Sequence, residues 1–256
     1  MTGYVTSLGT VSETTITVLG QDLASDLMGQ VGFGELAFWL VALRRPSAGE
    51  RRLFEAVLVA LAEHGLTPSA IAARLTLTGA PESVQGAMAA GLLGGGSRFL
   101  GVTEDAGRFL SAALQGSTED TDLDALARSV VSEQKAAGRY VPGLGHNVHR
   151  GGDPRTPVLF RIAEEEGLLG PHLRLFAAIG RVHPEILGRT LPLNGAGACG
   201  AALCDLGLPV DTLRGFALLA RSAGLVGHIA EEMRRPIGRE VYEAVERGTE
   251  YDSPVS

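Results

Sequence analysis

The side chains best suited to chemistry lie in one short segment, residues 143–155, which reads Gly-Leu-Gly-His-Asn-Val-His-Arg-Gly-Gly-Asp-Pro-Arg. It places two imidazoles, His146 and His149, beside two guanidiniums, Arg150 and Arg155. Imidazole can act as an acid, a base or a polarising group near neutral pH, and a guanidinium can hold a carboxylate or a phosphate. Glycine beside His146 allows a ligand to approach the main chain closely. The segment is a candidate anion site, and the alternative is a polar surface loop.

The common metal and nucleotide motifs do not fit this sequence. His146 and His149 are too few ligands for a metal site, and residues 143–145 lack the third glycine and the preceding strand of a dinucleotide fingerprint. Cys199 and Cys204 stand five apart in a segment rich in glycine and alanine. That spacing favours two small buried thiols over a disulfide or metal ligands. We therefore expect no bound metal.

Five further cationic positions could take part in binding or could be structural. His64 precedes a glycine at a predicted helix end, where a capping or solvated histidine is common. Arg221 interrupts an apolar helix and needs an anion, either a protein carboxylate or a ligand. His228 fits a hydrogen-bonded interior histidine. Arg234 and Arg235 read as a solvated pair of charges before a proline.

Composition excludes several classes of protein. The chain has 256 residues, 45% of them apolar, which is typical of a folded protein with one large domain or two small ones. Its 22 Lys and Arg against 29 Asp and Glu give a net charge of −7, which disfavours nucleic-acid binding. We see no signal peptide and no apolar run long enough to span a bilayer, so we expect a cytoplasmic protein without membrane association.

The elements that must position these side chains are mostly helices. Alternating Thr and Val within residues 4–19 predict a short strand or hairpin, and helical spacing begins near Leu23. Ser47 and Glu50 form a capping box. Spacing, caps and breakers predict helices at about 48–64, 68–76, 79–93, 104–115, 120–138, 156–167, 169–179, 183–190, 197–207 and 211–224, with a last one or two over 225–247, broken near Pro236. The sequence therefore predicts an all-α fold with a short β element at the N-terminus.

The segment 143–155 resembles the Gly-X-Gly-His…Asp-Pro-Arg signature of the citrate synthase superfamily. Residues 63–65 and 86–99 resemble the branch that contains citryl-CoA lyase and the carboxy-terminal module of ATP-citrate lyase. Further stretches that are similar to the family, in the same order, are 16–23, 33–47, 193–194, 215–228 and 235–236. The resemblance covers nearly the whole chain.

The resemblance implies a fold, an assembly and a reaction. The fold is all-α, with a large domain formed by 1–103 and 194–256 and a small inserted domain at 104–193. The assembly is a homodimer whose active sites need both subunits. The reaction makes or breaks the carbon–carbon bond between the acetyl methyl of a coenzyme A thioester and the keto carbon of oxaloacetate. Coenzyme A is thus a substrate, and no metal is implied.

The resemblance also implies roles for individual residues. His146 matches the histidine that contacts the carbinol or keto oxygen, and it is paired with His64 as the catalytic set. One of Arg234 and Arg235 reaches the substrate across the dimer in the family, and we assign Arg235. The other expected contacts are Arg155, Arg221 and Asn194 for the carboxylates, and Gly143, Gly145 and Arg150 for coenzyme A.

Two departures from the family pattern leave the reaction open. Phe99 replaces the histidine of citrate synthases proper, as it does in the lyase branch. Ala196 stands where the family has its catalytic aspartate, and alanine cannot move a proton to or from the acetyl methyl. Three hypotheses follow: a lyase that cleaves citryl-CoA, a related enzyme that acts on another 3-hydroxyacyl-CoA, or a homologue that binds without turnover. Glu104 and Asp205 are the other carboxylates considered as a replacement.

Overall fold

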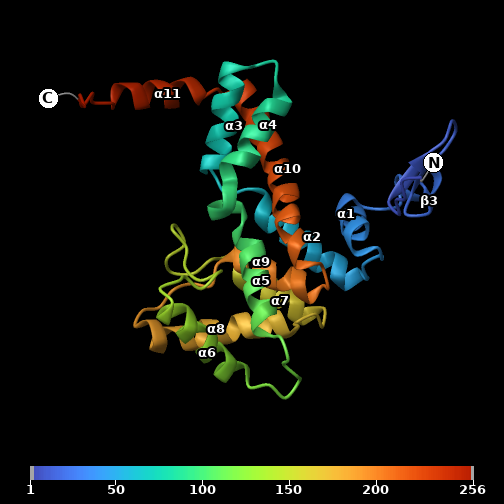
Figure 1. The fold of residues 1–256 in the computed structure, drawn as a ribbon. Coiled ribbons are helices and arrows are strands. Elements are labelled where there is room, and N and C mark those ends of the chain that lie inside the picture. The colour runs from blue at the N-terminus through green and yellow to red at the C-terminus, as the bar shows by residue number, and fades with distance from the viewer. Residues whose placement is uncertain (1–2, 255–256) are drawn as a thin grey trace. The chain divides into compact units, whose positions relative to one another are not determined.

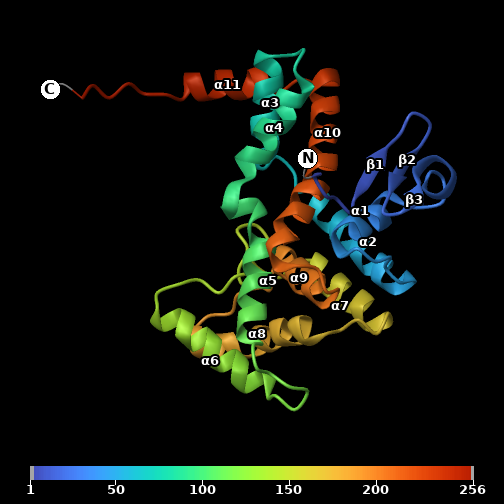
Figure 2. The same cartoon turned by 45° about the vertical axis from the view of Figure 1, so that its right-hand side comes forward.

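The computed structural model describes residues 3–254 and begins with a three-stranded antiparallel sheet (Figures 1 and 2). Its strands β1 (Gly9–Val11), β2 (Ile16–Val18) and β3 (Gln21–Asp22) pair in the order β1-β2-β3. Thr10 faces Thr17 across the first pair. The predicted hairpin is confirmed, with a third short strand added to it.

The remainder of the described chain is helical, as predicted. A short turn of helix, η1 (Leu23–Leu27), follows β3, and its first amides donate to the side chain of Asp22. The other helices are α1 (Phe33–Ala42), α2 (Ala48–Ala62), α3 (Pro68–Gly79), α4 (Val84–Gly95), η2 (Gly96–Leu100), α5 (Val102–Ala113), α6 (Leu123–Ala136), α7 (Arg155–Glu165), α8 (Pro171–Leu187), α9 (Gly195–Asp205), η3 (Val210–Thr212), α10 (Leu213–Arg234) and α11 (Gly238–Arg247). The all-α class with a small β element is confirmed.

Local capping chemistry sets several of the helix starts. The capping box at α2 is present: the Glu50 amide donates to the Ser47 hydroxyl at 3.2 Å, and the Ser47 amide donates to the Glu50 carboxylate at 2.7 Å. Helix α3 has Pro68 in its first turn and Thr67 as its cap. These short-range bonds explain why the predicted starts lie close to the observed ones.

Two predicted helix breaks are wrong. The predicted helices 169–179 and 183–190 form one helix, α8, which contains Pro184. A proline removes one backbone donor, and so close to the helix end that loss does not stop the helix. Helix α10 likewise runs unbroken through Gly224. A Cβ at Gly224 would clash with the carbonyl oxygen of Ala62, so this glycine serves close packing and does not end the helix.

The chain folds into two compact units, which we call unit 1 and unit 2 and describe separately. Unit 1 contains the described residues through Leu58 together with Thr103–Leu213. Unit 2 contains Val59–Val102 and the described residues from Arg214 onward. The expected large and small domains are a different division of the chain and remain a prediction.

Each unit has its own apolar interior. In unit 1, α8 packs against both α6 and α9, and Phe38 meets Phe54 edge-to-face with ring centroids 5.4 Å apart. In unit 2, α3 and α4 lie side by side, as both views show. Both cysteines are free and buried in α9, as predicted. Within the described residues no helix has the length and apolar character needed to cross a membrane.

Candidate active site

The segment 143–155 is fastened to the start of α9 in unit 1. The amide of Asn194 donates to the carbonyl of Gly143 at 2.9 Å, and the amide of Gly145 donates to the carbonyl of Pro192 at 2.7 Å. The Asn194 side chain donates to the Gly145 carbonyl and accepts from the amide of Gly197, each at 2.8 Å. Asn194 thus caps α9 and holds the segment in place with one side chain.

Gly143 and Gly145, two of the four glycines of this segment, are needed for different structural reasons. Gly143 has φ +81°, and a Cβ there would lie 2.8 Å from the ring of Phe176 and 3.0 Å from the Cα of Gly197. Gly145 has φ +92° with open space around its Cα. Glycine is therefore needed at 143 for packing against α9, and at 145 for the backbone conformation.

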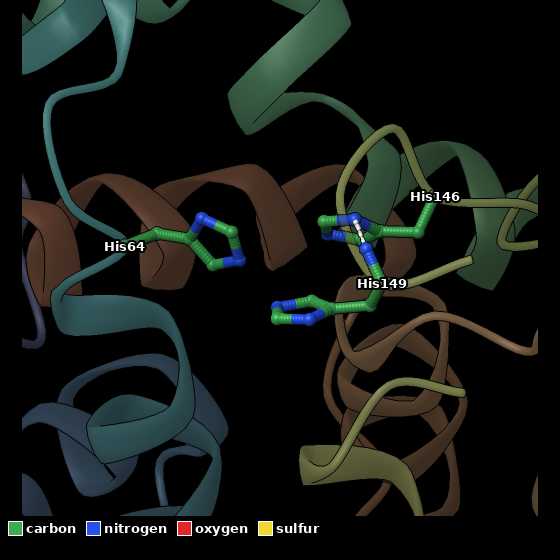
Figure 3. Close-up of side chains that lie close together, drawn as sticks. All are labelled: His64, His146 and His149. Carbon is green, nitrogen blue, oxygen red and sulfur yellow. Dashed lines mark hydrogen bonds between the residues drawn. The ribbon is translucent and has the colours of Figure 1, made fainter. Parts of the chain in front are cut away.

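His146 is held by its own loop. Its Nδ1 accepts hydrogen bonds from the amides of Val148 and His149, each at 3.0 Å (Figure 3). The His146 and His149 rings lie with their centroids 4.5 Å apart. Because Nδ1 accepts two N–H groups, we assign the proton of the neutral ring to Nε2. His146 therefore presents a hydrogen-bond donor, which suits contact with a carbinol or keto oxygen.

Asp153 holds Arg155 in place. It lies in the same sequence motif, where no role was predicted for it. The Arg155 Nε donates to Oδ1 at 2.9 Å and an Nη donates to Oδ2 at 2.7 Å. Oδ2 also accepts from the amide of Gly195 at 2.7 Å. The Asp153 side chain is fully buried, while Arg155 retains 20% exposure. A Cβ on Gly195 would lie 2.5 Å from the Arg155 Nε, so the start of α9 leaves space only for the arginine.

Pairing with Arg155 keeps Asp153 charged. Burial by itself would raise the pKa of this carboxyl. The hydrogen bonds from the Arg155 guanidinium and from the amides of Gly195 and Arg155 outweigh burial and hold the pKa well below its usual range. The arginine head is therefore fixed in direction by a permanently ionised partner.

Ala196 is the second residue of α9, directly after the bonded Gly195 amide. The carboxylates considered as replacements are engaged elsewhere in unit 1. Asp205 is 1% exposed and accepts from the amides of His172 and Leu173, each at 2.9 Å, and from the His172 ring at 2.8 Å. Glu104 pairs with Arg108 at 2.8 Å. The contacts of both residues are those of structural carboxylates.

Arg150 is exposed and borders a cavity of about 530 Å³ in unit 1. Thr156, Phe160 and Leu193 are among the other residues that line it. The volume falls in the range of small-molecule pockets. The lining combines two arginines, Arg150 and Arg181, with apolar side chains of α7 and α8.

The remaining candidates lie in unit 2. His64, which Figure 3 also labels, follows the end of α2, next to Glu63. Arg221 is buried in α10, with an Nη 3.8 Å from the Glu63 Oε2. The sequence left open whether Arg221 meets a protein carboxylate or a ligand, and in the structure the Glu63 carboxylate lies beside it. Arg235 is exposed just beyond the end of α10.

His228 is an interior histidine, as predicted. It is 8% exposed, and its Nδ1 accepts from Arg74. Sequence reasoning did not find Glu63, Arg74 or Glu232, which surround it in unit 2. Alone they are ordinary charged residues at helical positions, and only the spacing of Arg221 and His228, two turns apart on one helix, could have pointed to a shared face.

The chain is similar to several known proteins. The profile described as "Citrate synthase, C-terminal domain" matches residues 19–241. The chain belongs to the citrate synthase family. The structure of citryl-CoA lyase from Hydrogenobacter thermophilus is similar over 99% of this chain and 96% of that one, with a TM-score of 0.87 and 29% identity. The predicted membership of the superfamily, in its citryl-CoA lyase-like branch, is thereby confirmed.

Other members of the family are larger. ATP citrate lyase from Methanosaeta concilii, in complex with (3S)-citryl-CoA, is similar over all of this chain and 42% of that one, with a TM-score of 0.81 and 23% identity, which supports the fold. A probable ATP-citrate synthase of Caenorhabditis elegans is 24% identical over 84% of this chain, and the beta chain protein 1 of Arabidopsis thaliana is 27% identical over 76%. The chain spans 20% and 34% of the lengths of these two relatives. The relatives are named as lyases and synthases, so the prediction of an enzyme is confirmed at the level of the family.

Proposed function

We propose that the protein is a carbon–carbon lyase that cleaves citryl-CoA to acetyl-CoA and oxaloacetate, or catalyses the reverse condensation. The observation that carries the proposal is the similarity to citryl-CoA lyase along almost the full length of both chains. The geometry adds a histidine that presents a donor, and an arginine aimed by a buried carboxylate. Both fit a substrate that combines a carbinol oxygen with several carboxylates.

The carboxylates of the substrate need cations at fixed positions. We assign Arg155 and Asn194 in unit 1, and Arg221 and Arg235 in unit 2, to these groups on the family resemblance. The fixed direction of Arg155 supports its assignment, because a pre-oriented guanidinium loses less freedom when it binds. We assign Arg235 to the site of a second subunit in a homodimer.

Cleavage requires that negative charge develop on the carbinol oxygen while the carbon–carbon bond breaks. The hydroxyl proton passes to a base, for which His64 is our candidate, the bonding pair of the C–C bond passes to the acetyl carbon, and the oxygen becomes the keto group of oxaloacetate. A donor from the His146 Nε2 stabilises that oxygen. His64 is assigned to the same step on the family resemblance. The acetyl-CoA enolate then takes up a proton at its methyl carbon.

Ala196 raises the question of which group supplies that last proton. A general acid at this point usually contributes a factor of about 10²–10⁴ in rate. Asp205 and Glu104 already pair with other side chains, so neither is favoured as the replacement for the family's aspartate. The alternative functions are therefore a related reaction on another 3-hydroxyacyl-CoA, or binding of a carboxylate and coenzyme A without turnover.

Coenzyme A is the proposed second ligand. We assign Gly143 and Gly145 to its main-chain contacts and Arg150 to a phosphate. The exposure of Arg150 beside a cavity supports this assignment. We also propose that the protein acts in the cytoplasm without a bound metal.

The test is release of oxaloacetate from citryl-CoA by the purified protein, with Ala196→Asp measured beside it. We expect cleavage by the parent, and a rate at least tenfold higher in the variant. Aspartate at the second position of a helix suits the dipole, so the variant should fold. Binding of citrate without cleavage, with activity only in the variant, would favour a non-catalytic homologue. Cleavage of other 3-hydroxyacyl-CoA thioesters alone would favour the related reaction.

A further inference from the structure

A chain of charged and polar groups runs through unit 2 from a buried arginine to the helix end that carries His64. Arg74 of α3 is 2% exposed and donates to three acceptors on α10: His228, Glu231 and Glu232. The bond to the Glu232 carboxylate is 3.0 Å long. Glu232 in turn accepts from the amide of Gly238 at 2.7 Å. At this end of the series Arg74 and Glu232 are buried and paired with each other, while Glu231 is half exposed.

The arginine fixes the tautomer of His228. Its Nε and one Nη donate to the His228 Nδ1 at 3.1 and 2.9 Å. Two donors on Nδ1 leave no place for a ring proton there, so the proton is on Nε2. The His228 Nε2 lies 3.0 Å from the Oε2 of Glu63, a close contact that does not have the geometry of a hydrogen bond. Arg74 thus determines that His228 presents a donor toward this carboxylate.

Glu63 connects this buried chain to two assigned site residues. The same Oε2 lies 3.8 Å from an Nη of Arg221, and His64 is the next residue along the chain. Arg221, Gly224 and His228 share one face of α10 at helical spacing. The close approach of Gly224 to the carbonyl of Ala62 brings the end of α2 onto this face. Glu63 is half exposed, so burial alone does not fix its side chain.

We infer that Arg74, His228 and Glu63 form a positioning relay that orients Arg221, and the helix end that carries His64, for a substrate carboxylate. The inference rests on the proposed function for the roles of Arg221 and His64. The Glu63 Oε1 accepts from the amide of Gly65, and the contact of Oε2 with His228 limits where the carboxylate can lie beside Arg221. None of the three relay residues is assigned to touch the substrate.

Two variants test the relay by calorimetric titration with citrate. In His228→Asn the amide oxygen can still accept from Arg74, but the side chain is too short to reach Glu63. We expect the Kd for citrate to rise about tenfold, or about 1.4 kcal/mol, because Glu63 loses the neighbour that limits its position, with the Kd for coenzyme A unchanged. Glu63→Gln, at a half-exposed position, should fold and weaken citrate binding in the same direction.

The matched control is Thr78→Val. The Thr78 hydroxyl donates to the Arg74 carbonyl at 2.9 Å, at the far end of the cluster. We expect this variant to lower the melting temperature while the Kd for citrate stays within about twofold. An unchanged Kd in His228→Asn would overturn the relay. Tighter citrate binding in Glu63→Gln would also overturn it, because Glu63 would then compete with the substrate for Arg221.

Nitrogen-15 spectra of the histidine rings separate failure of the relay from failure of the proposed function. We expect His228 to carry its proton on Nε2, with that resonance shifted by Glu63→Gln and much less by Thr78→Val. A proton on Nδ1 would overturn the relay whatever the protein binds. If the parent protein binds neither citrate nor coenzyme A, the proposed function fails, and the relay is judged from these spectra alone.

Discussion

Each unit contains one buried ion cluster, and the two clusters differ in whether the carboxylate or the arginine is the buried member. In unit 1 the carboxylate of Asp153 is the fully buried member, and the Arg155 that it holds retains 20% exposure. In unit 2 the arginine is the buried member: the Arg74 side chain is 3% exposed and is surrounded by carboxylates. The first cluster can therefore present its own arginine to a ligand. The second can act on a ligand only through the residues beyond it, His228 and Glu63.

The two clusters also differ in how far their members lie apart in the sequence. Asp153 and Arg155 are two residues apart, whereas Arg74 meets its partners across 154–158 positions. A pair formed within one turn of chain needs only local geometry, whereas a pair between α3 and α10 exists only when unit 2 is packed. The comparison predicts that removing a charge lowers the free energy of unfolding more in unit 2, because more partners there lose the group that pairs with them.

The largest effect is expected for Arg74→Met. Methionine fills similar space but leaves Glu232 buried at 4% exposure without its cation, together with an unsatisfied acceptor on His228. Breaking a buried pair from one side costs about 3–5 kcal/mol, and we expect about 4 kcal/mol of unfolding free energy. Urea denaturation followed by circular dichroism measures it. The exposed pair of Arg239 and Glu243 provides the control.

In that control, Glu243→Gln should leave the urea midpoint unchanged, because exposed ion pairs contribute little. A loss below about 1 kcal/mol in Arg74→Met would contradict the view that its three acceptors depend on it. It would also remove the main reason to expect a larger loss of stability in unit 2 than in unit 1.

Asp153→Asn is expected to cost less, about 3 kcal/mol, because Arg155 keeps access to solvent after its partner is neutralised. Asparagine can still accept from the amide of Gly195, so the start of α9 should survive. The matched control is Asp124→Asn, in an exposed pair with Arg181, which should leave the urea midpoint in place. If Asp153→Asn proved costlier than Arg74→Met, the comparison would be reversed.

The acid dependence of stability sharpens this second prediction. The pKa of Asp153 is depressed in the folded protein, so its contribution is fully present above the unfolded-state pKa near 4 and is lost as the pH falls toward the folded-state value. We expect the gap in unfolding free energy between the parent and Asp153→Asn to shrink by about 1–2 kcal/mol between pH 6 and pH 3. A gap that stayed constant with pH would show that Asp153 is not a source of the acid sensitivity.

The same contrast between local and long-range contacts explains which elements could be predicted from the sequence. The capping box of Ser47 and Glu50, the cap of Asn194 and the clustered cations of 143–155 are local, and the helices and candidate residues that depend on them were predictable. The break expected near Pro184 was wrong, because the missing donor lies close to the end of α8, a helix that packs against α6 and α9. Local sequence signals predict where a helix can begin or end, and tertiary contacts decide at which of those positions it does end.

The candidate site divides in the same way. Arg155 was found because its motif is contiguous, and the role of its partner Asp153 could have been recognised two positions away. Glu63, Arg74 and Glu232 could not be found, since nothing in a single sequence shows that α3, the end of α2 and α10 meet. Arg221 was recognised as needing an anion, but the sequence left its partner open, because the choice between a ligand and Glu63 depends on that meeting.

The smallest effect is expected for Arg74→Met on the labelling of the two cysteines, which report on unit 1 alone. Burial raises the pKa of Cys199 to about 12 and that of Cys204 to about 11, so neither thiol should react with iodoacetamide at pH 8 in the folded protein. Labelling then requires opening of α9, and its rate measures the local stability of unit 1. Asp153→Asn should speed labelling strongly, because Asp153 is bonded to the start of that helix. Arg74→Met should leave the rate within about twofold if the units open separately. Equal acceleration in both variants would mean that the units open as one cooperative block, and the two clusters would then stabilise a single structure.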